Sequence, residues 1–313
     1  MAQLTTNTTA FIEAEQYSQF ILLNLHDGLL GEQFYRNVTD FGSGTTLHIK
    51  TIGSVTVQDA AEDVPLVYNP IESGEVTLTI TDYKGDAWYV TDDLREDGAQ
   101  IDALMAQRAA EGTRAIQEVF ETRFLATANA GQTNASPNTI NGFPHRIAST
   151  ETNNVFALSQ LIAMRLAFDK ANVPDTGRVF IADPIVEATL NGLVTITHDV
   201  TDFGANILRS GLASGMRFVQ QLFGFDIILS NRLPHGTFSD GTTSVSNAVA
   251  NIAMCVLDDQ TKPVMVAWRR MPKTEGERNK DRRRDEFVTT CRYGMGVQRV
   301  DTLGVIITSA VNY

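Results

Sequence analysis

One long amphipathic stretch, residues 93–129, most constrains what this chain can fold into. It reads DLREDGAQIDALMAQRAAEGTRAIQEVFETRFLATAN, and its large apolar residues recur at steps of three, four or seven. These residues are Leu94, Ile101, Leu104, Met105, Ile116, Val119, Phe120 and Phe124. The pattern predicts one uninterrupted helix of roughly 50 Å, several times the length of the common ~11-residue helix. An ordinary compact domain does not need so long a rod.

The start of this helix carries a clear sequence signal. Asp93 is the predicted N-cap and Glu96 follows three residues later, so carboxylates lie where free backbone amides and the helix dipole favour negative charge. An alternative is a pair of ordinary helices that break at Gly112, because a glycine inside a helix costs about 1 kcal/mol. Both interpretations stay open at this point.

A long hairpin is predicted before the helix. After Gly42–Gly44 the apolar period changes to two, in TTLHIKTIGSVTV and again in EVTLTITDYKGDAWYV. The connection between these strands is far longer than a normal hairpin turn, and it carries acidic residues with no Lys or Arg. The acidic residues of the connection and of its edges are Asp59, Glu62, Asp63, Glu72 and Glu75. A hairpin whose tip carries only negative charges is expected to project as an arm.

The N-terminal residues alternate polar and apolar clusters. Residues 1–10 are Thr-rich and polar, whereas the following segment contains the apolar run Phe20–Leu23 and a polar break at His26–Gly28. These apolar residues need a surface supplied from elsewhere. That surface is either the core of the same chain, which is the default, or a neighbouring subunit.

The second half of the chain predicts a mixed α/β domain followed by long strands. GRVFIADPIVEATLNGL is typical of a buried strand, a turn and a helix, and a helical segment precedes it. FGFDIILSN and NIAMCVLDD predict further strands. KPVMVAWRR predicts another, after which MPKTEGERNKDRRRDE crosses to the final strands, where Gly294 and Gly296 are expected at β-bulges.

No constellation of residues points to catalysis, a cofactor or a metal. The five histidines are scattered, and HExxH, GxSxG and a Walker loop are all missing. Cys255 and Cys291 lack CxxC spacing and are expected to be reduced packing residues of a cytosolic protein. We find neither a signal peptide nor a long apolar span for a membrane. The chain is therefore not expected to be an enzyme.

The most cationic segment runs from Arg269 to Arg284, and its arginines are Arg269, Arg270, Arg278, Arg282, Arg283 and Arg284. Acids interrupt the run, it lacks aromatic residues for base stacking, and the whole chain has a net charge of −12. Nucleic-acid binding is therefore disfavoured. A solvated loop and an electrostatic patch between subunits remain as interpretations.

The order of these segments resembles the major capsid protein of tailed bacteriophages, which has the Hong Kong 97-type α+β fold. GTTLHIKTIG and GEVTLTITDYKGDAWYV resemble its extended loop, TDDLREDGAQIDALMAQRAAEG its spine helix, and GRVFIADPIVEATL with FGFDIILSNRLP its axial domain. VMVAWRR and DEFVTTCRYGMGVQRVDTLGVIIT resemble the closing strands. The resemblance covers nearly the whole chain through element order, without an invariant motif.

The resemblance implies five segments. Residues 1–41 would form an N-terminal arm, 42–90 the extended loop, 91–150 a peripheral domain with the spine helix, and 151–262 a mixed α/β axial domain. Residues 263–313 would supply return strands of the peripheral domain. The implied function is that of a structural capsid subunit, located in the virion and assembled in the host bacterial cytoplasm. Alternatives are an encapsulin-like compartment and a cytosolic α/β enzyme with an unrecognised site.

The implied partners are copies of the chain itself, as hexamers and pentamers. A separate scaffolding protein, a portal protein, a decoration protein and weakly, non-specifically held DNA complete the set, with no membrane. From the charges we hypothesise that the acidic hairpin tip meets the segment Arg269–Arg284 of another subunit. A bend at Gly112 during shell expansion is a further hypothesis.

Overall fold

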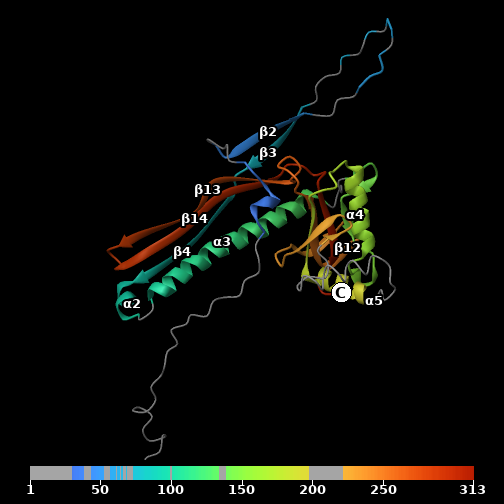
Figure 1. Ribbon diagram of the computed structural model, residues 1–313. Coiled ribbons are helices and arrows are strands. Elements are labelled where there is room, and N and C mark those ends of the chain that lie inside the picture. Colours follow the sequence, from blue (N-terminus) through green and yellow to red (C-terminus); the bar gives the residue numbers. More distant parts are fainter. Residues whose placement is uncertain are drawn as a thin grey trace, which may run out of the picture.

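In the described part of the chain, one long helix joins two large β-sheets, and two two-stranded sheets accompany them (Figure 1). The computed structural model describes residues 30–38, 44–52, 57–60, 62–63, 65, 68, 73–98, 101–133, 139–196 and 221–313, without the side chains of residues 52, 102 and 191–196. Most of the predicted N-terminal arm lies outside these residues. The four-stranded sheet lies along the helix, and the seven-stranded sheet lies at the C-terminal end of the helix.

The predicted long helix is confirmed as α3 (Ile101–Gly131), but its start differs from the prediction. A separate short helix, α2 (Asp92–Asp97), precedes it and ends at Gly98. The cap of α2 is Thr91, whose hydroxyl accepts a hydrogen bond from Leu94 N at 3.4 Å, so the prediction of Asp93 as cap is wrong. Asp93 instead lies in the first turn. The alternative break at Gly112 is also wrong, because this glycine lies inside α3.

The four-stranded sheet has the order β1 (Arg36–Asn37), β13 (Val264–Asn279), β14 (Arg284–Val297) and β4 (Asp82–Thr91). β1 is parallel to β13, and the other pairs are antiparallel. Helix α3 covers one face of this sheet, where Phe120 stacks on Trp268 at 4.8 Å and meets Tyr293 edge-on at 5.1 Å. Aromatic packing thus fixes the helix along the sheet.

The predicted hairpin forms from β2 (Thr46–Ile52) and β3 (Ser73–Thr79) and leaves the opposite face of this sheet. β3 and β4 are separate strands rather than one long strand, because the chain changes partner after Thr79. The bulges predicted at Gly294 and Gly296 are wrong, since both residues keep regular register. A Cβ at Gly294 would lie 2.5 Å from Thr79 O, so the glycine admits the close backbone of the hairpin.

The seven-stranded sheet is the core of the second half of the chain. Its order is β7-β15-β12-β8-β10-β9, and β11 pairs with β12. The strands are β7 (Arg146–Ala148), β8 (Arg178–Ala182), β9 (Gln221–Leu222), β10 (Phe225–Leu229), β11 (His235–Ser239), β12 (Ser244–Cys255) and β15 (Leu303–Ser309). Helices α4 (Leu158–Lys170) and α5 (Pro184–Ile196) flank β8, which confirms the predicted helix, strand and helix.

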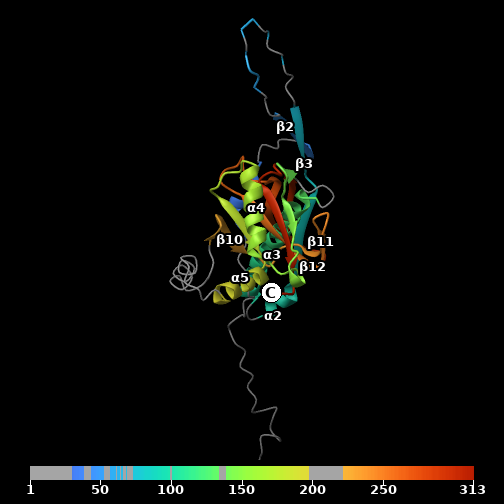
Figure 2. The same ribbon diagram turned by 90° about the vertical axis from the view of Figure 1, so that its right-hand side faces the viewer.

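Alternating residues of β8 face two different apolar layers. Phe180 and Ala182 pack with α4 and α5, whereas Val179 and Ile181 pack with the C-terminal part of α3. The α3 contribution includes Phe124 and Leu125. Helix α3 therefore supports both sheets, since its middle lies on the four-stranded sheet and its end on the seven-stranded sheet (Figures 1 and 2).

Two smaller connections complete the arrangement. Asn141 and Gly142, both with positive φ (51° and 85°), form a tight turn between β5 (Thr139–Ile140) and β6 (Phe143–Pro144). Two short 3₁₀ helices, η2 (Glu32–Phe34) and η3 (Thr152–Asn154), precede β1 and α4.

The last strand corrects the prediction for residues 263–313. β13 and β14 lie together in the four-stranded sheet. β15 instead lies between β7 and β12 in the other sheet. Its residues Val305, Ile306 and Ile307 are fully buried, and such a continuous apolar run is typical of a strand covered on both faces. The other segment boundaries stay an interpretation.

Candidate functional site

The connection between β2 and β3 carries the predicted acidic tip. Asp59, Glu62 and Asp63 are exposed there, and Glu75 is exposed on β3, where it contacts His48. Glu72 lies outside the described residues. The same connection exposes Val57 (91%) and Tyr68 (98%), and its described residues lie away from both sheets (Figures 1 and 2). The tip therefore offers carboxylates together with unburied apolar side chains.

The basic segment is not a loop, so the loop interpretation is wrong, although most of its side chains are exposed to solvent. β13 continues to Asn279 and β14 begins at Arg284, with a short turn between them in which Arg283 has a φ of 48°. Antiparallel pairing of both strands with each other, and of β14 with β4, stabilises this end of the sheet. The strands are found here although β13 has no apolar alternation after Met271.

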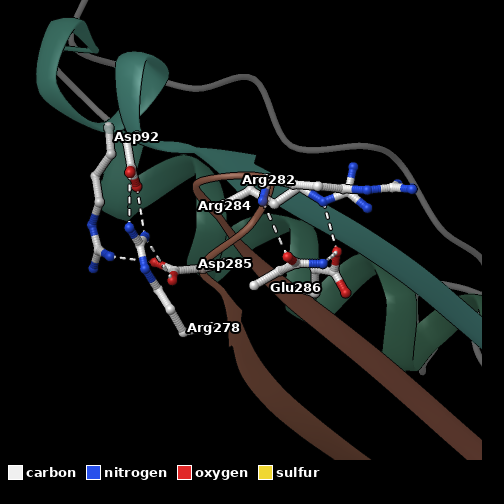
Figure 3. A network of polar contacts seen from close by, with 8 residues as sticks. Asp92, Arg278, Arg282, Arg284, Asp285 and Glu286 are labelled. Carbon is white, nitrogen blue, oxygen red and sulfur yellow. Dashed lines mark hydrogen bonds and ion pairs between the residues drawn. The ribbon is translucent and has the colours of Figure 1, made fainter.

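Arg278 is bound within its own chain (Figure 3). Its guanidinium lies 2.6 Å from Asp92 Oδ1 and 3.2 Å from Asp285 Oδ1, and Arg95 contacts the other oxygen of Asp285 at 2.5 Å. The hydrogen bond from Arg278 lowers the pKa of Asp92 below its ordinary value. The network joins β13, β14 and α2, so Arg278 has a structural role in the subunit.

The other arginines of the turn divide into two kinds. Arg284 donates to Glu286 Oε1 at 2.6 Å and lies 4.2 Å above the ring of Tyr89. Arg282 and Arg283 are exposed, and within the part of the chain that the structure describes no side-chain ion pair is found for them. The cationic charge of this turn that remains for another molecule thus belongs to Arg282 and Arg283, together with the exposed Lys280 of the same turn.

A second cationic surface lies beside the root of the hairpin. A shallow hollow of about 610 Å³ is lined by Arg269, Arg270 and Arg292, together with Ile80, Thr81 and Tyr83. Arg270 also contacts Glu275 at 2.7 Å. Hydrogen bonding by Lys273, followed by the charge of Arg270, lowers the pKa of Glu275. Sequence reasoning missed Arg292, because only strand pairing brings β14 beside the chain between β3 and β4.

Gly112, the predicted hinge, has a packing role that the sequence did not indicate. Arg108 forms a bidentate ion pair with Asp86 of β4 (2.8 and 2.7 Å), directly beside Gly112. A Cβ at Gly112 would lie 2.5 Å from Asp86 Oδ2 and 3.0 Å from Arg108 Nη1. The glycine therefore gives this ion pair its space, and the hinge stays a prediction.

Arg146 joins the end of α3 to the seven-stranded sheet. This buried residue of β7 donates to Asn129 Oδ1 at 3.0 Å, to Gln132 O at 2.8 Å and to Ser239 O at 2.7 Å. Burial lowers its pKa from the ordinary value. A cation that binds the free carbonyl groups at a helix C-terminus stabilises that end. The contact holds α3 in a fixed position relative to the sheet.

The described residues offer contact surfaces and no group of His, Cys, Asp and Glu that could hold a metal ion. Among those residues, no helix has both the length and the apolar character needed to cross a membrane. Cys255 and Cys291 are buried and free, as predicted for packing residues, and burial raises the pKa of Cys291. The candidate site is therefore a set of surfaces, which are the acidic tip, the β13–β14 turn and the arginine hollow.

Comparisons with known proteins agree with this geometry. Residues 74–308 match the family described as "Phage capsid protein". A search of curated proteins gave no match. Among solved structures, the capsid of the cyanophage P-SCSP1u has a TM-score of 0.71 at 19% identity, with 96% of this chain and 94% of that chain covered. The mature capsid of bacteriophage PhiM1 has a TM-score of 0.70 at 14% identity, with 96% and 93% covered. These likenesses show the Hong Kong 97-type fold, as the sequence predicted. Since the family match spans most of the chain, this protein belongs to the family of phage capsid proteins.

Proposed function

We propose that copies of this chain assemble, as hexamers and pentamers, into an icosahedral shell that encloses double-stranded phage DNA. Membership of the family makes the chain a structural protein of the virion shell. It also favours this role over the encapsulin-like compartment and over the enzyme. The observation that carries the proposal is the hairpin, because it leaves Val57 and Tyr68 almost fully exposed on an arm that a lone subunit cannot cover.

We propose further that the acidic tip of one copy contacts cationic surface of a neighbour. In Figure 1 the hairpin and the β13–β14 turn lie toward opposite ends of the four-stranded sheet, so another copy must supply the partner. Arg278 and Arg284 are engaged within their own chain. The candidate partners are therefore Lys280, Arg282 and Arg283 of the turn, or the arginine hollow. Charge complementarity of this kind sets the register between subunits.

Charge reversal tests this pairing. The double variant Glu62→Lys with Asp63→Lys should abolish closed particles, as measured by sedimentation and negative-stain microscopy. Adding Arg282→Glu and Arg283→Glu should partly restore them, whereas rescue by Arg292→Glu would assign the contact to the hollow. Normal assembly of the first variant would contradict the pairing and leave the shell proposal intact.

Further partners follow from the same role. We propose a separate scaffolding protein, a portal protein and a possible decoration protein, with assembly in the host bacterial cytoplasm. The net charge of −12 favours weak, non-specific contact with packaged DNA, because a strongly cationic wall would retain the genome. Co-expression with candidate partner proteins, followed by microscopy of the particles, tests each of these partners.

A further inference from the structure

An apolar hollow lies where the described part of the chain begins. Its volume is about 420 Å³, within the range of roughly 300–1,000 Å³ of ligand pockets. Its lining includes Leu30 and Tyr35, Ile116 and Phe120 of α3, and Trp268 of β13. The hollow is separate from the acidic tip and from both cationic surfaces.

Three aromatic side chains of the lining pack against one another. Phe120 stacks on Trp268 at 4.8 Å, and Tyr35 meets Phe120 edge-on at 5.5 Å. Burial, and then the charge of Glu32, raises the pKa of Tyr35 to about 12, so its hydroxyl is neutral at physiological pH. Met271 at the rim is 53% exposed. Such a surface favours apolar side chains over water.

Two carboxylates line the hollow: Glu32 is exposed, and the buried one is Glu121, which is already engaged. This carboxylate is 3% exposed, and it accepts hydrogen bonds from Leu30 N at 3.1 Å and from Ser230 Oγ at 2.9 Å. A polar or cationic ligand would therefore compete with existing partners. The hollow fits an apolar occupant, and the bond to Leu30 N fixes the chain at its edge.

We propose that the apolar run Phe20–Leu23 of the same chain occupies this hollow. Leu23 is seven residues from Leu30, a separation that spans up to about 25 Å when extended. The polar break at His26–Gly28 suits a chain that reverses direction. A segment tethered so near its site has a millimolar effective concentration, which favours the same copy over a neighbour. The inference is independent of the proposed shell.

Disulfide trapping tests the occupant in the full-length protein. Leu22→Cys and Met271→Cys are combined in one chain, while the native cysteines are buried. Mild oxidation should give an intrachain disulfide, detected by mass mapping. Thr5→Cys with Met271→Cys is the matched control and should crosslink far less.

A second experiment uses two differently tagged chains, each with one of the two introduced cysteines, mixed before oxidation. It tests whether the segment of one copy reaches the hollow of another. A crosslink between the tags would mean that a second copy fills the hollow and would overturn the proposal.

Fluorescence gives a second measurement that does not need a disulfide. Trp88 and Trp268 are the two tryptophans of the chain, so Trp88→Phe leaves Trp268 as reporter. Replacement of Phe20–Leu23 by serines should shift its emission to longer wavelength and raise its quenching by acrylamide. Absence of both the intrachain disulfide and the fluorescence change would overturn the proposal, even if shells still form. Loss of shells with both signals present would instead count against the proposed function.

Discussion

The two sheets of this protein are stabilised in different ways. The seven-stranded sheet has apolar layers on both faces, and its central residues Phe180, Ile252 and Ile306 are fully buried. The four-stranded sheet is covered by α3 on one face, and its far end has exposed side chains on β13 from Met271 to Arg278. The first sheet is complete within one chain, whereas the second leaves surface for other copies.

Ion pairs and aromatic stacking replace an apolar core at this far end. Arg278 joins Asp92 to Asp285, and Trp88 stacks on Phe287 at 4.4 Å between adjacent strands. Exposed ion pairs contribute little stability each, so strand pairing carries most of the order there. The comparison predicts that substitutions act more strongly in the first sheet than in the second.

The largest expected effect is in the seven-stranded sheet. Phe180→Ala should lower the free energy of unfolding of the unassembled subunit by about 3–5 kcal/mol, because it leaves a cavity between β8 and the flanking helices. Denaturant unfolding measures this loss in the free energy of unfolding. Val288→Ala, on the open face of the other sheet, is the control and should change stability by less than about 0.5 kcal/mol. Equal losses would contradict the comparison.

Gly112→Ala tests the contact between α3 and the four-stranded sheet. In a free helix this change stabilises by about 1 kcal/mol. Here the added Cβ meets the ends of the Asp86 and Arg108 side chains, which must shift, so this gain should be cancelled and a loss of up to about 1 kcal/mol is expected from thermal or denaturant unfolding.

The matched control removes the obstruction. Asp86→Ala with Gly112→Ala should recover stability relative to the sum of the single variants, since the added methyl group then has space. Strict additivity would show that Gly112 does not serve the ion pair. If the single alanine variant were more stable than the wild type and failed only in shell expansion, the hinge hypothesis would gain support.

The pH dependence of stability should also differ between the regions. His145 is buried beside the seven-stranded sheet, and burial lowers its pKa from 6.5. As the pH falls, this histidine is protonated in the unfolded chain before it is protonated in the folded chain. Its contribution to the free energy of unfolding is therefore fully present above about pH 6.5 and is lost as the pH falls below that value. His145→Asn should flatten this part of the profile. An unchanged decline in the variant would show that another group is responsible.

The smallest expected effect comes from Asp92 in the exposed network. Its lowered pKa means that its contribution is present above about pH 3.8, the ordinary value, and is lost as the pH falls further. Asp92→Asn should remove this late acid-dependent loss without altering the response near pH 6.5. Unfolding curves between pH 2 and 5 measure this loss of stability. If the variant and the wild type lost the same stability over this range, the role of the Arg278 contact would be contradicted.

Sequence reasoning found the elements whose buried face leaves a regular pattern of apolar residues in the sequence. The spacing of Ile116, Phe120 and Phe124 predicted α3, and the apolar run VFIA predicted β8. The hairpin and the family resemblance also followed from periodicity and element order. Each of these signals reflects a face that packs within the same chain.

Contacts that depend on three-dimensional proximity gave no such signal. The distal halves of β13 and β14 lack apolar alternation, so their segment looked like a loop. Only the fold places Arg292 beside Arg269 and Arg270, and only the fold brings Arg146 to its hydrogen-bond partners. Gly112 looked like a helix breaker, although it makes room for the Asp86–Arg108 pair. Tertiary context decides such positions.

The central claim is that this subunit completes its burial by contact with copies of itself. Electron cryomicroscopy of the purified, assembled protein tests it most directly. The account predicts closed hollow particles in which the β2–β3 connection of each copy lies on a neighbour's four-stranded sheet, with Val57 and Tyr68 covered. A stable monomer in which the β2–β3 connection folds against its own sheets and covers Val57 and Tyr68 would contradict it.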